Sequence, residues 1–199
     1  MTQNVKAVLL VGGMGTRLRS ILPATPKPMA SVGRGSFLDL LVRQLQCQGI
    51  CRLVMCTGHL ADQIENEFED GKAWGVTIEY SREPEALGTG GAIKLAERYL
   101  LDTRDFLVMN GDSFLEIDLH KFIRFHRAHD GLASIAVWKA EDTARFGTVH
   151  VTSGGRVTAF AEKTGASGPG LINAGVYAFN QAVFQYIPAG IRPLKEDPS

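Results

Sequence analysis

The strongest constraint on the fold is the alternation of two hydrophobic patterns in the first 115 residues of this 199-residue chain. Short continuous apolar runs are typical of strands covered on both faces, and segments with apolar residues every three or four positions are typical of amphipathic helices. The predicted strands are residues 6–11, 51–58, 75–81 and 105–113. The predicted helices are residues 36–49, 59–71, 88–100 and 118–129. This alternation favours an α/β fold with a mostly parallel sheet, in which ligands bind at the carboxyl ends of the strands.

Two of the predicted helices carry more detailed expectations. In residues 36–49 we expect Phe37, Leu40, Leu41 and Leu45 to share the buried face, with Val42 beside them, and Gly49 to end the helix. In residues 88–100 we expect the helix to begin beyond the glycines.

After residue 132 the pattern changes to short strands separated by Gly and Ser turns. The strands are predicted at residues 132–140, 146–152, 156–163 and 171–180. We interpret them as an antiparallel extension and a return strand on the same core, which makes the sheet mixed. No linker divides the chain, so residues 1–199 are predicted to form one domain.

Composition narrows the classes of partner. Apolar residues make up 45% of the chain, and 21 Lys and Arg balance 21 Asp and Glu. Because the formal net charge is zero, the chain as a whole does not attract polyanions, and we expect no nucleic-acid or membrane partner. The N-terminus has no secretory pattern and no apolar run approaches a membrane span, so a cytoplasmic location is expected. The three cysteines have no metal-site spacing and are expected to be reduced thiols.

The segment VLLVGGMGTRLRSILPATPKP, residues 8–28, follows the first predicted strand. Gly12, Gly13 and Gly15 allow close approach and positive φ, so that backbone N–H groups can face an anion, and Arg17 and Lys27 add positive charge. A Walker A loop and a G-x-G-x-x-G loop are both absent, which excludes P-loop hydrolysis and dinucleotide binding. The alternative is a Gly- and Pro-rich connection with solvated charges.

This segment resembles the signature of the sugar-1-phosphate nucleotidylyltransferases, G-x-G-T-R-L followed by P-K-P. Further segments resemble that family in the same order: LGTGGA, NGDS, FGTV, FAEK and NAGVY. The resemblance spans nearly the whole chain. It implies a three-layer, Rossmann-like mixed sheet with a nucleotide-binding half (residues 1–115) and a sugar-binding half (residues 116–199).

The resemblance also implies the roles of individual residues. The catalytic residues would be Arg17, Lys27, Asp112 and Lys163, and Asp112 would bind Mg²⁺. The nucleotide would contact Leu10, Gly12, Gly13, Gly15, Thr16, Glu83, Gly88 and Thr89. The sugar would contact Asn110, Gly147, Glu162 and Asn173. Taken alone, Asp112 also fits a simple turn residue, and Glu162 and Lys163 fit exposed residues at a strand end.

These residue types suit attack of a sugar phosphate on the α-phosphorus of a nucleoside triphosphate. Two anions must meet and pyrophosphate must leave, so countercharges and positioning do the work and no protein nucleophile is needed. The sequence offers no Ser or Cys nucleophile with a plausible base. His126 and His129 have helical i, i+3 spacing, and we expect them to be solvated rather than metal-bound.

The base and the sugar are less constrained. A carboxylate at Glu83 suits the adjacent N1–H and N2–H₂ donors of guanine better than uracil or thymine, although Glu85 or a backbone group could be the reader instead. The residues of the motifs are most similar to those of guanylyltransferases that act on D-glycero-D-manno-heptose 1-phosphate. The resemblance implies a supply of GDP-heptose for surface polysaccharide such as capsule, S-layer glycan or lipopolysaccharide. The alternatives are a mannose-1-phosphate guanylyltransferase and an N-acetylmuramate 1-phosphate uridylyltransferase. The expected partners are GTP and a sugar 1-phosphate, with a homodimer left open.

One departure concerns a second metal ligand. Family members usually carry a later Asp in a W-x-D-x-G-T segment, whereas this sequence ends at RPLKEDPS and Asp197 does not match that segment. We therefore expect either that the sequence stops short of the family's usual end or that the second ligand is missing. The second reading favours a non-catalytic subunit that binds a nucleotide sugar.

Overall fold

The computed structural model describes residues 5–13, 24–161 and 167–188. Its centre is an eight-stranded sheet in the order β5-β4-β1-β6-β10-β8-β9, with β7 paired to β10 outside this path. The parallel part consists of β1 (Lys6–Leu10), β4 (Arg52–Thr57), β5 (Thr77–Arg82) and β6 (Asp105–Asn110). The mixed, mostly parallel α/β sheet is as predicted.

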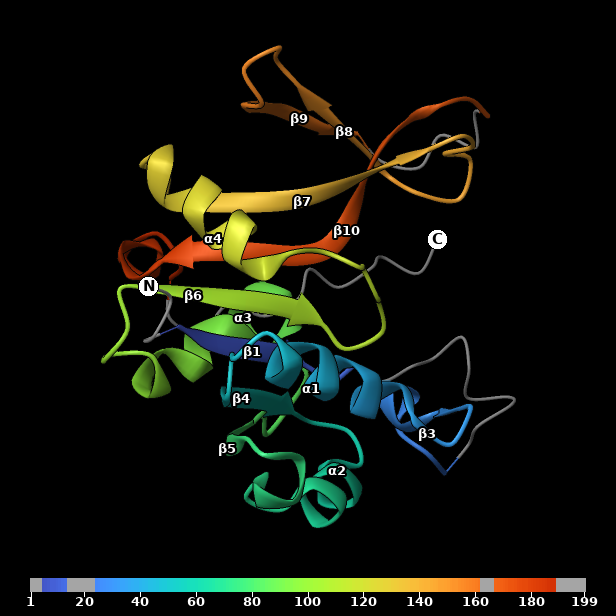
Figure 1. Cartoon of the computed structure of the whole chain (residues 1–199), viewed down its shortest axis with the longest axis vertical. Coiled ribbons are helices and arrows are strands. Elements are labelled where there is room, and N and C mark those ends of the chain that lie inside the picture. The colour runs from blue at the N-terminus through green and yellow to red at the C-terminus, as the bar shows by residue number, and fades with distance from the viewer. Residues whose placement is uncertain (1–4, 14–23, 162–166, 189–199) are drawn as a thin grey trace.

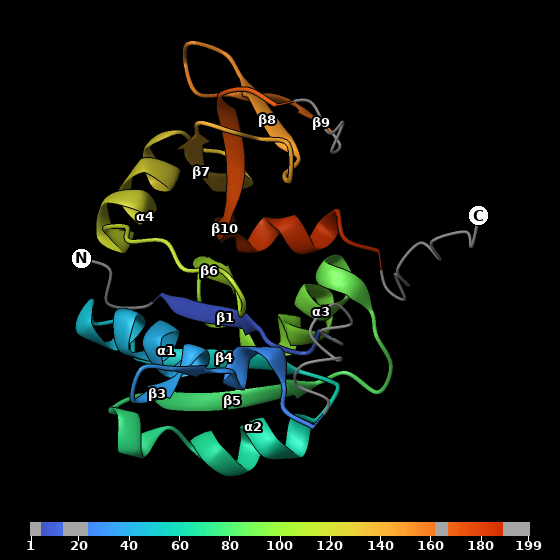
Figure 2. The same ribbon diagram turned by 90° about the vertical axis from the view of Figure 1, so that its right-hand side faces the viewer.

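Helices cover both faces of the sheet, and Figures 1 and 2 show α1 and α3 on opposite sides of it. The α-helices are α1 (Phe37–Cys47), α2 (Ala61–Phe68), α3 (Gly88–Leu95) and α4 (Leu119–Ala128). The 3-10 helices are η1 (Lys27–Met29), η2 (Lys72–Trp74), η3 (Ala96–Tyr99) and η4 (Gln181–Gln185). A small hairpin of β2 (Ser31–Val32) and β3 (Gly35–Ser36) precedes α1.

The second half of the chain adds antiparallel strands to β6. These are β7 (Ala133–Ala140), β8 (Thr148–Val151), β9 (Val157–Ala161) and the long β10 (Gly170–Asn180). The end of β10 pairs with β6, whereas its beginning pairs with β7 and β8. The β8–β9 hairpin lies at one end of the molecule (Figure 1). The predicted antiparallel extension and return strand are thus both present.

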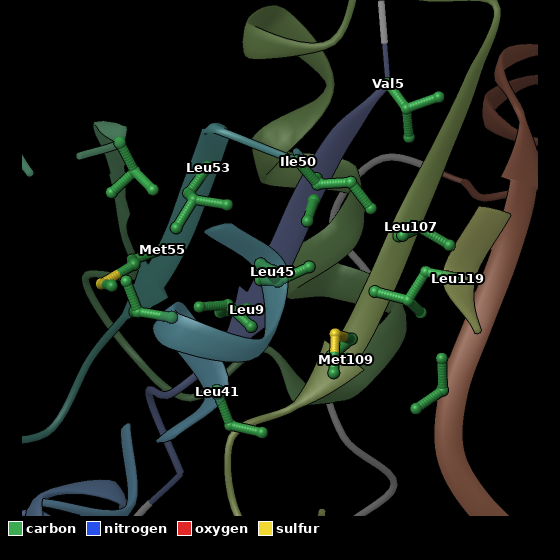
Figure 3. Close-up of a cluster of buried hydrophobic side chains, with 14 of the residues drawn as sticks. Val5, Leu9, Leu41, Leu45, Ile50, Leu53, Met55, Leu107, Met109 and Leu119 are labelled. Atoms are coloured by element: carbon green, nitrogen blue, oxygen red, sulfur yellow. The ribbon is translucent and has the colours of Figure 1, made fainter. Parts of the chain in front are cut away.

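The central strands are buried on both faces, which explains their continuous apolar sequences. Alternate residues of β1 point to opposite sides: Leu9 belongs to the cluster that includes α1, α2 and α4, and Val8 belongs to the cluster that includes α3 and η4. Figure 3 shows Leu41 and Leu45 of α1 over this first side of the sheet. The two faces therefore form separate hydrophobic clusters.

Three details differ from the expectations. The buried face of α1 consists of Leu38, Leu41, Val42 and Leu45, while Leu40 is exposed and Phe37 only partly buried, because the i, i+3, i+4, i+7 stripe begins one residue later than expected. Helix α3 begins at Gly88, so its glycines form the first turn rather than precede it. Gly49 ends α1 with a positive φ of 70°, as predicted.

His126 is the third difference. It is buried rather than solvated, with only 2% of its surface exposed. Its Nδ1 lies 2.9 Å from Ser134 Oγ, and its Nε2 lies 3.9 Å from the buried Asp105. Asp105 also accepts hydrogen bonds from Arg127 and Asn180. This network joins α4 to β6, β7 and β10.

Candidate functional site

The carboxyl ends of β1 and β6 lie side by side and carry two of the predicted motifs. Leu10 pairs with Asn110, so the glycine loop after β1 and the turn after β6 leave the sheet together. The Gly111 N–H donates to the Leu10 carbonyl at 2.9 Å, and a side chain at Gly111 would collide with that oxygen. Parallel pairing thus brings together segments about 100 residues apart, as expected at this edge of an α/β sheet.

A pocket of about 330 Å³ opens at this edge. Most of its lining had been predicted as nucleotide-, sugar- or metal-binding: Leu10, Gly12, Gly13, Glu83, Gly88, Thr89, Asn110 and Asp112. The two lining residues missed were Ala86 and Ala92. Ala92 lies one turn beyond Gly88 on α3, and this helical spacing was the signal that could have identified it.

Gly12 is required by close packing at the base of the pocket. An added Cβ would lie 2.9 Å from Glu83 Oε1 and 3.0 Å from the Gly58 nitrogen. The His59 N–H donates to the Gly12 carbonyl at 3.4 Å, so the turn after β4 supports the loop. Neither Gly12 nor Gly13 has the positive φ expected of the glycine loop, and Gly15 lies outside the described residues.

Glu83 connects the glycine loop to α3. Its Oε2 accepts from the Leu87 N–H at 2.9 Å, and Gly88 follows with a φ of 70° that favours glycine. The side chain is half-buried, and this burial raises the pKa of Glu83, an effect that the Leu87 hydrogen bond partly opposes. Glu85, the alternative base reader, is exposed and does not line the pocket.

Asp112 forms an ion pair with Lys27. Lys27 Nζ lies 2.5 Å from Asp112 Oδ2, and the Ser113 hydroxyl donates to Oδ1 at 3.2 Å. Lys27 reaches this position from η1, which follows Pro26 and contains the buried Pro28. The structure thus brings Lys27 and Asp112, two of the residues implied to be catalytic, into direct contact.

Asn110 is braced by a bulge in β10. The pairing of β10 with β7 shifts between Asn173 and Tyr177, and Gly175 in this bulge has a φ of 75°. A Cβ on Gly175 would lie 2.9 Å from Asn110 Nδ2. Asn173 does not line the pocket; its Oδ1 accepts from the Gly175 N–H at 2.8 Å, and its Nδ2 donates to the Tyr177 hydroxyl at 2.6 Å.

The remaining predicted residues fall into two groups. Gly147 is not part of the pocket lining and lies before β8, where an added Cβ would be 3.0 Å from the Ala161 carbonyl. The others lie outside the described residues: Gly15, Thr16, Arg17, Glu162, Lys163 and Asp197.

The donor set around Asp112 suits a hard cation that also binds substrate. Within the described ranges, no three His, Cys, Asp or Glu side chains are grouped as a metal site. Asp112 still offers one half-exposed carboxylate beside the Asn110 side chain at the pocket wall. Mg²⁺ commonly binds through one or two carboxylates plus substrate phosphates, so these residues fit it.

None of the helices in the described ranges is long and apolar enough to span a bilayer.

This chain is similar to known proteins over most of its length. The family model described as "Nucleotidyl transferase" matches residues 6–199. A D-glycero-alpha-D-manno-heptose 1-phosphate guanylyltransferase from Aneurinibacillus thermoaerophilus is 39% identical over 91% of this chain and 77% of its own length. A mannose-1-phosphate guanylyltransferase from Mycobacterium tuberculosis is 38% identical over 95% of this chain, which spans only 52% of that protein.

A solved structure has a similar fold. The crystal structure of HddC from Yersinia pseudotuberculosis complexed with GMP-PN has a TM-score of 0.83 and 33% identity, and covers 93% of this chain and 80% of its own. The sequence matches and the similar fold agree: this chain belongs to the nucleotidyl transferase family.

Proposed function

We propose that this chain transfers a guanylyl group from GTP to D-glycero-D-manno-heptose 1-phosphate, releasing pyrophosphate and GDP-heptose. The observation that carries the proposal is the pocket where the Gly12 loop, Glu83 and the Lys27–Asp112 pair meet. The similarity to a heptose 1-phosphate guanylyltransferase supports the choice of substrate. We expect the reaction in the cytoplasm, where nucleoside triphosphates are made.

In the proposed reaction a sugar-phosphate oxygen forms a bond to the α-phosphorus of GTP, and the bond from that phosphorus to the bridging oxygen of pyrophosphate breaks. The barrier comes from repulsion between two anions and from charge that develops on the leaving group. Arg17 and Lys27 are proposed to neutralise the triphosphate, and Lys163 the sugar phosphate. Bound at Asp112, Mg²⁺ would supply charge neutralisation and a template for the phosphates.

Glu83 is the proposed reader of the base. An ionised carboxylate is an acceptor only, which matches the adjacent N1–H and N2–H₂ donors of guanine. Its Oε2 already accepts from Leu87, but each carboxylate oxygen has two lone pairs, so acceptor capacity is left for the base. The Leu87 bond also holds the carboxylate in place before the base arrives. Asn110 is proposed to contact the sugar from the adjacent wall.

The test is a panel of nucleoside triphosphates and sugar 1-phosphates with pyrophosphate release as the readout. We expect release with GTP and D-glycero-D-manno-heptose 1-phosphate together, and none when either is omitted. Faster turnover with mannose 1-phosphate, or with UTP and N-acetylmuramate 1-phosphate, would replace the substrate assignment. Calorimetric binding of a nucleotide sugar with no turnover of any pair would instead indicate a binding subunit.

A further inference from the structure

The contact between Lys27 and Asp112 joins two groups with different tasks in the proposed function. Lys27 is needed at the phosphates, and Asp112 is needed as the ligand of a divalent cation. In the structure these two groups bind each other, with 2.5 Å between Nζ and Oδ2. We propose that Lys27 and the divalent cation are mutually exclusive partners of Asp112, so that metal binding releases Lys27 toward the substrate.

The turn that carries Asp112 and its carboxylate group are both held by hydrogen bonds. The turn after β6 is pinned by the Gly111 N–H on the Leu10 carbonyl, and no side chain fits at Gly111. Asp112 Oδ1 accepts a hydrogen bond from the Ser113 hydroxyl. A cation that binds Asp112 must therefore bind it close to where Lys27 does.

The lysine, in contrast, is anchored at its backbone, while Asp112 is the ion-pair partner of its side chain within the described ranges. Pro28 is buried, Met29 packs against the core cluster of α1, and the Ala30 N–H closes the turn on the Lys27 carbonyl at 3.1 Å. The side chain is 37% exposed. A four-carbon stem on such a turn can swing its ammonium group between two anions while the backbone stays fixed.

Simple electrostatics makes the two partners exclusive. Magnesium binds carboxylate oxygens at about 2.1 Å, so a dication on either oxygen of Asp112 would face an ammonium group a few ångströms away. No other ion pair is formed by Asp112 within the described ranges. The inference rests on the proposed function for the destination of Lys27, but the exchange itself needs neither GTP nor sugar.

Metal affinity of the nucleotide-free protein provides the first test, with Mn²⁺ binding measured by electron paramagnetic resonance. Lys27→Met keeps an unbranched side chain, one atom shorter, and removes its charge. Since a hydrogen bond between charged groups is lost, we expect Mn²⁺ to bind roughly tenfold more tightly, or more. The matched control is Lys72→Met, which removes an exposed lysine that also lies 2.5 Å from an aspartate, Asp70, and should leave the affinity unchanged.

The second test uses the wild-type protein and therefore does not depend on the folding of a variant. Lysines are acetylated with an N-hydroxysuccinimide ester, and the rate at Lys27 is measured by mass spectrometry with and without saturating Mg²⁺. We expect Mg²⁺ to accelerate labelling of Lys27 severalfold and to leave Lys72 unchanged.

Equal Mn²⁺ affinity in wild type and Lys27→Met, no Mn²⁺ binding by either protein, or unchanged labelling of Lys27 would each overturn the inference. Because neither test uses GTP, a failure of the proposed function appears only in the pyrophosphate panel, and the two failures are distinguishable.

Discussion

Glu83 shows how one side chain can serve both the architecture and the chemistry of the pocket. Glu83→Gln keeps the acceptor for the Leu87 N–H but replaces one carboxylate oxygen by a donor that would face the donors of guanine. We expect kcat/KM for GTP to fall by roughly 10- to 100-fold, a loss typical of a mismatched polar contact, with a much smaller effect on UTP.

The matched control is Glu85→Gln, two residues away and exposed, for which both rates should stay within about twofold of wild type. If Glu85→Gln instead loses GTP selectivity, the reader of the base is Glu85.

Gly175 is a position where conformation and space both require glycine. Gly175→Ala would impose a φ of 75° on a residue with a Cβ and place that Cβ 2.9 Å from Asn110 Nδ2. We expect the free energy of unfolding to fall by about 2 kcal/mol or more, measured by urea denaturation. KM for the sugar 1-phosphate should also rise, because Asn110 must shift.

Gly155→Ala separates the effect of a positive φ from the effect of the collision with Asn110. Gly155 has a φ of 79°, but an added Cβ there would meet nothing within 4 Å. We expect this variant to lose about 1 kcal/mol from conformation alone. Equal losses in the two variants would contradict the collision with Asn110.

At the scale of elements, α2 and the turn before it contact Gly12 and Ala24, which lie on either side of the segment that contains Arg17. The His59 N–H donates to Gly12 at one end, and Gln63 Nε2 donates to the Ala24 carbonyl at 2.9 Å at the other. Gln63→Ala should therefore raise KM for GTP about three- to tenfold while the melting temperature changes little, because the lost bond is exposed.

The control on the same helix is the exposed Glu67→Ala, which should leave KM unchanged. A drop in melting temperature with an unchanged KM would mean that Gln63 is only structural.

The elements that were predictable are those determined by local pattern. Continuous apolar runs identified β1, β4 and β6 because both of their faces are buried. The pairing of β10 with β6 at one end and with β7 and β8 at the other could not be specified, because partner choice depends on contacts distant in sequence. His126 was misassigned for the same reason, since Ser134 and Asp105 bury it from other elements. The prediction of the site residues depended on the order of the family motifs. The contacts of Asn173 and Gly175 could not be predicted, because they depend on the bulge in β10.

At the scale of the whole molecule, the buried His126 makes stability depend on pH. Burial lowers the pKa of His126, the nearby Asp105 opposes this shift, and Arg127 and Arg104 reinforce it. Below an unfolded-state pKa of about 6.5 the unfolded chain gains a proton that the native state resists, so stability is lost as pH falls from that value toward the lower native pKa.

The measurement is urea denaturation at pH 7.5 and 5.5. His126→Asn cannot titrate, so its loss of stability between the two pH values should be smaller than that of wild type, even if it is less stable at both. His150→Asn, which alters an exposed histidine on β8, should keep the wild-type slope. An identical pH slope in wild type and His126→Asn would contradict the assignment.

The dual pairing of β10 also has a consequence for synthesis on the ribosome. β10 spans Gly170–Asn180, yet it occupies an interior place in the sheet beside β6, which is complete at Asn110. A nascent chain shorter than about 175 residues would therefore present the edge of β6 without its partner, and open edges favour pairing between chains. The edge of β6 at the centre of this enzyme is therefore covered only after β7, β8 and β9 have been made.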